Sequence, residues 1–144
     1  SFSESSSDFL ITASVQDKDI IFRGNDGGSG INALTLDMSE AGAATFNNNV
    51  TAFSDERLKD NIETLEDGLA KVEQLRGVTY TRDNREQIGV IAQEVEKVLP
   101  SIVNTTREYK SLSYVEVIPI LVEAIKEQQT IIEDLKTRIE TLEG

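Results

Sequence analysis

The stretch LVEAIKEQQTIIEDLKTRIETL, residues 121–142, carries the strongest structural pattern in the chain. Apolar residues recur in it at alternating spacings of four and three, which is the heptad repeat of a coiled coil. A helix packed on its own domain follows a 3.6-residue period and drifts out of this register, so the pattern favours helices that associate between chains. The repeat places Ile125, Ile132 and Ile139 at a positions, and Leu121, Gln128, Leu135 and Leu142 at d positions.

The heptads alone leave open the number of helices in this predicted coiled coil. Isoleucine at a with leucine at d favours two parallel helices. Ile131 at a g position widens the apolar face, which suits a larger bundle, and Gln128 places a polar group near the axis where it can fix the register. A dimer and a trimer are both compatible with the pattern.

Residues 54–120 predict a small α+β domain that leads into the long helix. Apolar spacing predicts a helix over Thr64–Leu75, with Thr64 as its N-cap, and a second helix over Ala92–Leu99 that Pro100 ends. The long helix is expected to run from about Tyr114 to Leu142, because Pro119 is tolerated only near its first turns.

Two strand pairs are predicted between these helices. Residues 78–81 and 87–91 flank Asp83-Asn84, a turn signal, and predict a hairpin. Residues 101–103 and 109–112 predict a second, shorter pair. The residues expected to form the core of the domain are Ile88, Val90, Ile91, Val95, Val98, Leu99 and Ile102.

Residues 1–53 differ in composition from the rest of the chain. They are rich in Ser, Gly, Asn, Thr and Ala, and Lys18 and Arg23 are their only cations. Each apolar run is too short to bury itself, so we expect strands that become stable when several chains wrap around one shared core. A disordered or tag-derived lead is the alternative, above all for residues 1–7. The runs are 9–12, 20–22, 34–38, 44–46 and 50–53, with turn signals at 25–28 and 40–42.

The composition excludes several function classes. The net charge of −12 argues against binding to nucleic acid or an anionic membrane, because phosphate neutralisation needs clustered Lys and Arg. The 144 residues include neither Cys nor His, which excludes the usual zinc sites and Ser-His-Asp catalysis. No apolar run approaches the roughly 18 residues of a membrane span, so we expect a soluble protein without metal or cofactor.

One segment at the boundary between residues 1–53 and the rest of the chain contains the residue types of a nucleophilic site. Without His, a Ser hydroxyl can be activated by a neutral Lys amine, and Ser54 and Lys59 are five residues apart. That spacing is roughly 140° around a helix, so the pair requires Ser54 to lie in an extended or turn conformation while Lys59 reaches back. Arg57 is a candidate cation beside Lys59, whereas Asp55, Glu56 and Asp60 oppose a neutral amine unless they turn outward. The alternative is that Ser54 is an ordinary helix N-cap followed by acidic residues.

Three stretches in order resemble the endosialidase-type intramolecular chaperones, which are self-cleaving serine peptidase domains at the C-termini of phage tail spikes and fibres. Together they cover essentially all of residues 54–144. They are SDERLKDNI at 54–62, IGVIAQEVEKVLP at 88–100, and the run from Tyr114 through AIKE at 124–127 into the heptads.

The resemblance implies a homotrimer that templates the folding of a preceding stalk and then cuts itself off. The cut would fall between Phe53 and Ser54, with Ser54 and Lys59 as a catalytic dyad. Residues 1–53 would be the end of a β-rich, triple-β-helix-like stalk, and 54–144 the chaperone, with 113–144 as its trimeric coiled-coil helix. Its partners would be two further copies and the stalk of the same protein, without nucleic acid or membrane. Assembly would take place in the host cytoplasm, and the parent protein would sit in the virion tail.

Three other functions are weaker alternatives. The leading one is a trimerisation module that does not cleave and remains as the tip of a fibre. A eukaryotic protein that uses such a domain to release a transcription factor is disfavoured, because the chain shows neither a basic DNA-binding region nor a membrane span. An enzyme with an external substrate fits least, since no catalytic cluster beyond the dyad is visible. Gln93 and Glu94 are weaker site candidates, and Arg76, Arg82, Arg85 and Arg107 are expected in salt bridges or on the surface.

Overall fold

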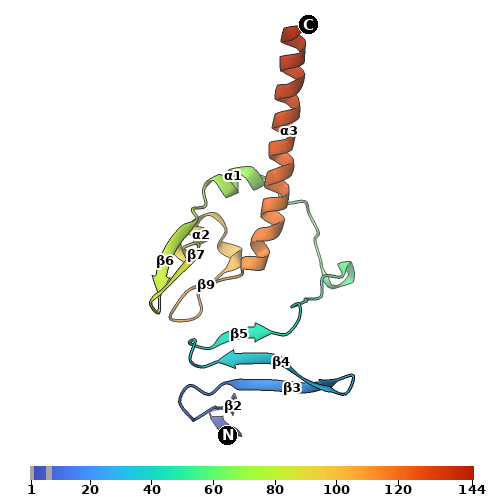
Figure 1. Cartoon of the computed structure of the whole chain (residues 1–144). Coiled ribbons are helices and arrows are strands. Elements are labelled where there is room, and N and C mark those ends of the chain that lie inside the picture. Colours follow the sequence, from blue (N-terminus) through green and yellow to red (C-terminus); the bar gives the residue numbers. More distant parts are fainter. Residues whose placement is uncertain (1, 6–7) are drawn as a thin grey trace. The chain divides into compact units, whose positions relative to one another are not determined.

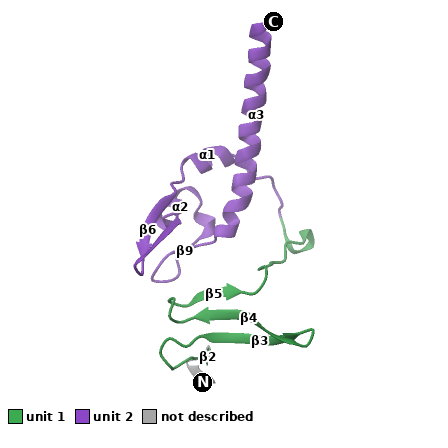
Figure 2. Cartoon of the chain, in the orientation of Figure 1, with its two compact units in different colours: residues 1–60 green, residues 61–144 purple. Residues whose placement is uncertain are grey.

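The computed structural model describes residues 2–5 and 8–144 (Figure 1). The chain divides into two compact units, residues 1–60 and 61–144 (Figure 2), which are described separately. The predicted boundary at Ser54 separates a stalk from a chaperone by function, and it stays a prediction. Of the lead considered at residues 1–7, positions 1, 6 and 7 lie outside the described residues.

The described residues of unit 1 form two small antiparallel sheets. Strands β1 (Phe2–Ser5) and β2 (Asp8–Ile11) form one pair. Strands β3 (Ile20–Asp26), β4 (Ser29–Asp37) and β5 (Ala43–Phe46) form a three-stranded meander. The strands predicted from residues 9–12, 20–22, 34–38 and 44–46 are therefore confirmed, whereas residues 50–53 form no strand and run as irregular chain.

The β3–β4 turn follows from its two glycines. Gly27 and Gly28 have φ values of 59° and 93°, which is left-handed backbone that residues with a Cβ seldom adopt. Positive φ at both central positions is the signature of the tight hairpin turn whose twist matches the flanking strands. The side chain of Asn25 accepts a hydrogen bond from the Gly28 N–H at 2.9 Å and closes the turn.

One face of the three-stranded sheet is apolar and remains largely uncovered. Phe22 pairs with Leu34, which in turn pairs with Phe46, so these side chains form a row across the strands. Phe22 and Phe46 are nevertheless 46% and 49% exposed. Within a single chain, this unit leaves accessible the surface that a fold normally buries.

Helix α1 (Gly68–Glu73) is shorter than predicted. The helix expected over Thr64–Leu75, with Thr64 as N-cap, is wrong at its start, because Asp67 takes the cap position with left-handed φ of 58°. The reason is tertiary. Gly68 lies against the long helix so closely that a Cβ would be 2.6 Å from the backbone nitrogen of Ala124.

The predicted hairpin is confirmed. Strands β6 (Val78–Arg82) and β7 (Arg85–Gly89) pair around Asp83 and Asn84, whose φ values of 52° and 60° match the same type of tight turn. Ile88 was expected in the core but is 83% exposed, because it lies opposite Thr79 on the uncovered face of this two-stranded sheet.

A short helix and a short strand pair follow the hairpin. Helix α2 (Ala92–Val98) confirms the second predicted helix, and Pro100 opens a single 3₁₀ turn, Pro100–Ile102. Strands β8 (Val103–Asn104) and β9 (Ser111–Leu112) form the second predicted pair, with shorter strands than the sequence indicated.

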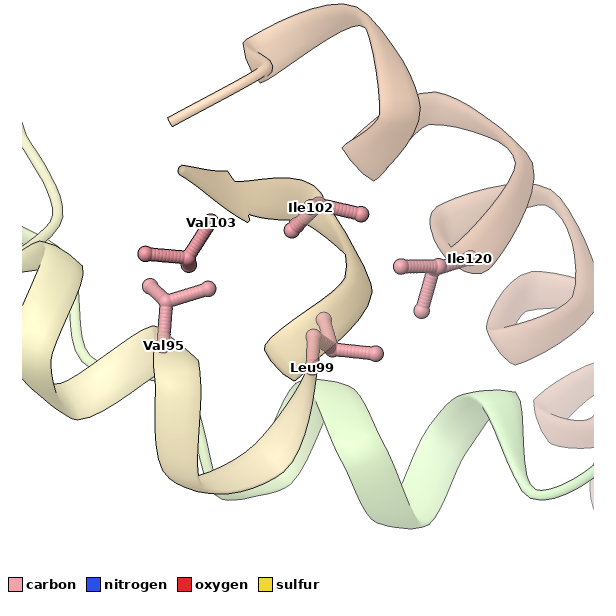
Figure 3. Packing of buried hydrophobic residues seen from close by; sticks show 5 residues of the cluster. All are labelled: Val95, Leu99, Ile102, Val103 and Ile120. Atoms are coloured by element: carbon pink, nitrogen blue, oxygen red, sulfur yellow. The ribbon is translucent and has the colours of Figure 1, made fainter. Parts of the chain in front are cut away.

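The core of unit 2 is small and contiguous. Its buried side chains come from α2, from the turn and strand after it, and from the long helix, and they converge in Figure 3. Val90, Val98 and Leu112 pack against this cluster while remaining partly exposed. The buried residues are Val95, Leu99, Ile102, Val103 and Ile120.

Helix α3 (Val117–Glu143) extends well beyond the core (Figure 1). A 3₁₀ turn at Tyr114–Glu116 precedes it, and Pro119 lies in its first turn as expected. Ile120 and Ala124 are 2% and 4% exposed and face the domain. The a and d positions face away from it. Those with large exposed apolar side chains are Leu121, Ile125, Ile132, Leu135, Ile139 and Leu142.

Over residues 2–5 and 8–144, none of the helices combines the length and the apolar character that crossing a bilayer requires.

Candidate functional site

The candidate site forms on a single turn that follows irregular chain. Asp55 has φ −64° and ψ 136°, and its side chain accepts a hydrogen bond from the Arg57 N–H, which caps the 3₁₀ turn Glu56–Leu58. The turn closes when the Lys59 N–H donates to the Glu56 carbonyl at 3.0 Å. Asp55, rather than Ser54, is therefore the N-cap, which corrects the alternative interpretation of the serine.

This turn brings Ser54 and Lys59 together. Ser54 precedes the turn in irregular chain, and Lys59 ends it in extended conformation, with φ −128° and ψ 138°. From there the lysine side chain reaches back, and its Nζ donates a hydrogen bond to Ser54 Oγ at 2.7 Å. The conformational condition that the five-residue spacing imposed is therefore met.

The heavy-atom distance fits general-base chemistry. A base must lie within about 2.6–3.2 Å of the atom whose proton it removes. In the observed direction Lys59 is the donor, and for catalysis the neutral amine would accept the Ser54 proton across the same contact. The geometry therefore suits a Ser-Lys pair, and the catalytic roles of the two residues stay a prediction.

Arg57 is engaged by Asp55 rather than by the lysine. Its Nε and Nη2 donate to the two carboxylate oxygens of Asp55 at 2.9 and 2.6 Å. The hydrogen bonds from the Arg57 side chain and backbone lower the pKa of Asp55, and the same side-chain contact raises the pKa of Arg57. The sequence pattern indicates Arg57 as a cation beside Lys59, but it does not predict the ion pair between Arg57 and Asp55.

The residues on both sides of the Phe53–Ser54 bond are exposed. Phe53 is 96% exposed and Leu58 is 67% exposed. With Asp55 and Arg57 they line a hollow formed by the neighbours of Ser54 in the sequence.

Of the remaining candidates, Arg76, Glu94 and Arg82 have structural partners. Arg76 Nη2 donates to Glu94 at 2.6 Å, which lowers the pKa of Glu94 and raises that of Arg76. Arg82 lies 3.5 Å from Asp83 in the hairpin turn. Among the side chains that the structure describes, no group of three or more Asp or Glu is placed to hold a metal ion.

A contact that the sequence did not indicate joins α1 to α3. The carboxylate of Glu127 accepts the backbone N–H groups of Gly68 and Leu69 at 2.8 and 2.9 Å. These N–H groups open helix α1 and have no partner within it. An acidic residue 59 positions further along the chain therefore serves as the cap of this helix.

Part of the chain matches a known protein family. Residues 54–104 match the family described as chaperone of endosialidase, a Peptidase S74 family, which confirms the resemblance found in the motif at 54–62. Peptidases of this type are self-cleaving serine peptidases.

The similar proteins are phage fibre proteins. The chain is 33% identical over 103 residues to the long tail fiber protein Gp37 of Enterobacteria phage K3 and equally to that of phage T2, covering 63% of this chain. It is 35% identical over 107 residues to Gp37 of Enterobacteria phage M1, covering 65% of this chain. It spans 8% of the length of the first two relatives and 43% of the third.

Proposed function

We propose that residues 54–144 are a C-terminal intramolecular chaperone of a phage tail fibre or spike. Three copies associate, template the folding of the preceding stalk and release themselves by cutting between Phe53 and Ser54. The observation that carries the proposal is the 2.7 Å contact between Lys59 Nζ and Ser54 Oγ, directly after the exposed residue Phe53. The family match at 54–104 and the tail fibre relatives support the chaperone role and a place in the virion tail.

The surfaces left uncovered in one chain support association. The a positions Ile125, Ile132 and Ile139 are 65%, 51% and 54% exposed, although burying each such side chain stabilises by about 1.5–3 kcal/mol. The apolar row Phe22–Leu34–Phe46 of unit 1 is a second surface that neighbouring chains would cover. A trimer buries both, which fits the state implied by the family.

The cleavage chemistry needs only groups of this chain and water. Ser54 Oγ attacks the Phe53 carbonyl carbon while Lys59 takes the hydroxyl proton. The C–N bond then breaks, the Ser54 nitrogen takes up a proton as it leaves, and an ester joins Phe53 to the serine oxygen. Water hydrolyses this ester, which gives a carboxylate at Phe53 and restores the serine hydroxyl.

Assembly before cleavage has a physical advantage. A three-chain stalk must align its chains in register before any strand is stable, and closing such long loops has a high entropic cost. Association of α3 fixes the register first. Cleavage then removes the template, and the finished stalk no longer has the same route for unfolding.

The alternative is a trimerisation module that stays attached as a fibre tip. The observation that favours it is the exposure of Lys59 in the single chain, with Glu56 and Asp60 beside it in the sequence. Only the neutral amine is a base. Desolvation of Lys59 must therefore come from assembly, and the module remains uncleaved if assembly does not provide it.

Intact mass after expression separates the two functions. We expect the wild-type chain to appear as fragments 1–53 and 54–144, whereas Ser54→Ala and Lys59→Ala remain intact and still trimeric by light scattering. The matched controls Ser101→Ala and Lys97→Ala, at exposed positions of unit 2, should cleave normally. An intact wild-type trimer would establish the alternative.

The order of events needs its own variant. Ile132→Asp places a charge at an a position and should give a monomer that stays uncleaved. A monomer that still cuts at Phe53–Ser54 would refute the dependence of cleavage on assembly.

A further inference from the structure

The carboxylate next to the nucleophile is fully engaged by one residue. Asp55 follows Ser54 directly, and its two oxygens accept three hydrogen bonds from Arg57. Two come from the guanidinium in a bidentate arrangement, and one comes from the backbone N–H that the carboxylate caps. Arg57 makes this contact although its side chain is 87% exposed.

Asp55 is a second candidate acceptor for Lys59, because it adjoins Ser54 in the chain and consecutive Cα atoms lie about 3.8 Å apart. A carboxylate is a stronger acceptor for an ammonium group than a hydroxyl is, because it adds the attraction of a full opposite charge to the hydrogen bond. An unpaired Asp55 would therefore draw Lys59 away from Ser54.

We propose that Arg57 is a positioning residue for the cleavage reaction, because it occupies the Asp55 carboxylate and so keeps Lys59 on Ser54. The inference rests on the proposed self-cleavage. Arg57 then acts through Asp55, which lies between it and Ser54 in the sequence. Arg57 touches neither the scissile bond nor the serine in this mechanism.

Two variants of this pair should differ in an unusual way in their cleavage rates. In Arg57→Ala the cap remains, but the carboxylate is released to compete for Lys59. In Asp55→Asn with Arg57→Ala the asparagine side chain still caps the turn, since Asn is as good an N-cap as Asp, and no carboxylate competes. The double variant should therefore cleave faster than the single variant, although it has lost more of the native contact.

The test is the rate of cleavage of the full chain at pH 7, followed by denaturing gel during cell-free synthesis. Arg57→Ala should cleave about two- to fivefold more slowly than wild type, the range that corresponds to an exposed ion pair. The double variant should return to within about twofold of wild type. Arg82→Ala, which breaks a comparable local pair with Asp83 in unit 2, is the matched control and should leave the rate unchanged.

Two results would overturn the inference: Arg57→Ala cleaving as fast as wild type, or the double variant cleaving no faster than Arg57→Ala. The second would mean that Arg57 only shapes the turn. Failure of the proposed function looks different, since wild type itself would then stay intact. Light scattering on each variant in a Ser54→Ala background checks that slow cleavage does not come from lost assembly.

Discussion

Replacing Glu127 with alanine removes the acceptor of two backbone N–H groups at the start of α1. The carboxylate holds the N–H groups of Gly68 and Leu69 at 2.8 and 2.9 Å, in a partly buried position between α1 and α3. Hydrogen bonds to charged groups contribute about 1.5–3 kcal/mol each, but water can enter this site and replace part of the loss. Loss of a helix N-cap costs about 1 kcal/mol. We therefore expect the free energy of unfolding to fall by about 2 kcal/mol.

Thermal unfolding provides the assay. For a unit of 60–100 residues, 1 kcal/mol corresponds to about 4–8 °C, so the Tm of Glu127→Ala should fall by about 8–16 °C. Calorimetry in a Ser54→Ala background keeps the chain intact, and equal protein concentrations remove the effect of association on Tm. Glu140→Ala makes the same chemical change at an exposed position of α3 and should shift Tm little. A fall in Tm no larger than that of Glu140→Ala would refute the capping role.

Three further predictions concern stability. Gly68→Ala places a Cβ 2.6 Å from the backbone nitrogen of Ala124, so α1 must move off α3, and the urea midpoint should fall by an amount corresponding to about 1–3 kcal/mol. Asn84→Val forces a β-branched residue to a φ of 60° and should cost about 1–2 kcal/mol by urea unfolding, whereas Asn84→Gly should not destabilise. Arg76 lowers the pKa of Glu94, so the pair stabilises the fold above the ordinary carboxyl pKa and this contribution is lost as pH falls through the lowered value. The difference in Tm between wild type and Arg76→Ala should accordingly be present at neutral pH and vanish in acid; a constant difference would contradict it.

The elements that sequence predicted well are those determined by local chemistry. Asp83 and Asn84 both tolerate left-handed backbone, so the hairpin turn between β6 and β7 could be placed from two residues. Pro119 is compatible only with the first turn of a helix, which located the start of α3 to within a few residues.

The elements that sequence missed depend on contacts between distant residues. The start of α1 is determined by the close approach of Gly68 to α3 and by Glu127, and no local pattern around Thr64 encodes either contact. Ile88 belongs to an apolar run, yet its face of the hairpin has no covering layer. Periodicity indicates which residues share a face, but not whether another element packs against it.

In the candidate site, too, one contact was predictable from the sequence and another was not. The segment 54–62 and its spacing predicted that Ser54 would contact Lys59 if the serine lay outside a helix, and the 2.7 Å contact agrees with this. The pairing of Asp55 with Arg57 was not predictable, because the segment offers several acids and two cations in a row. The conformation of one turn selects among these pairings, since it aligns the Arg57 N–H and guanidinium on the same carboxylate.

Helix α3 presents two faces at once, with Ile120 and Ala124 turned into the domain and Leu121 and Ile125 turned outward. Each residue advances a helix by about 100°, so a single inserted residue after Ala124 would rotate the entire distal stripe by about 100° relative to the domain. Seven inserted residues would bring it back nearly to its starting angle and lengthen the helix by about 10.5 Å. Natural length variation among chaperones built on this plan should therefore occur in steps of seven, with the angular phase fixed by the first two turns of the helix.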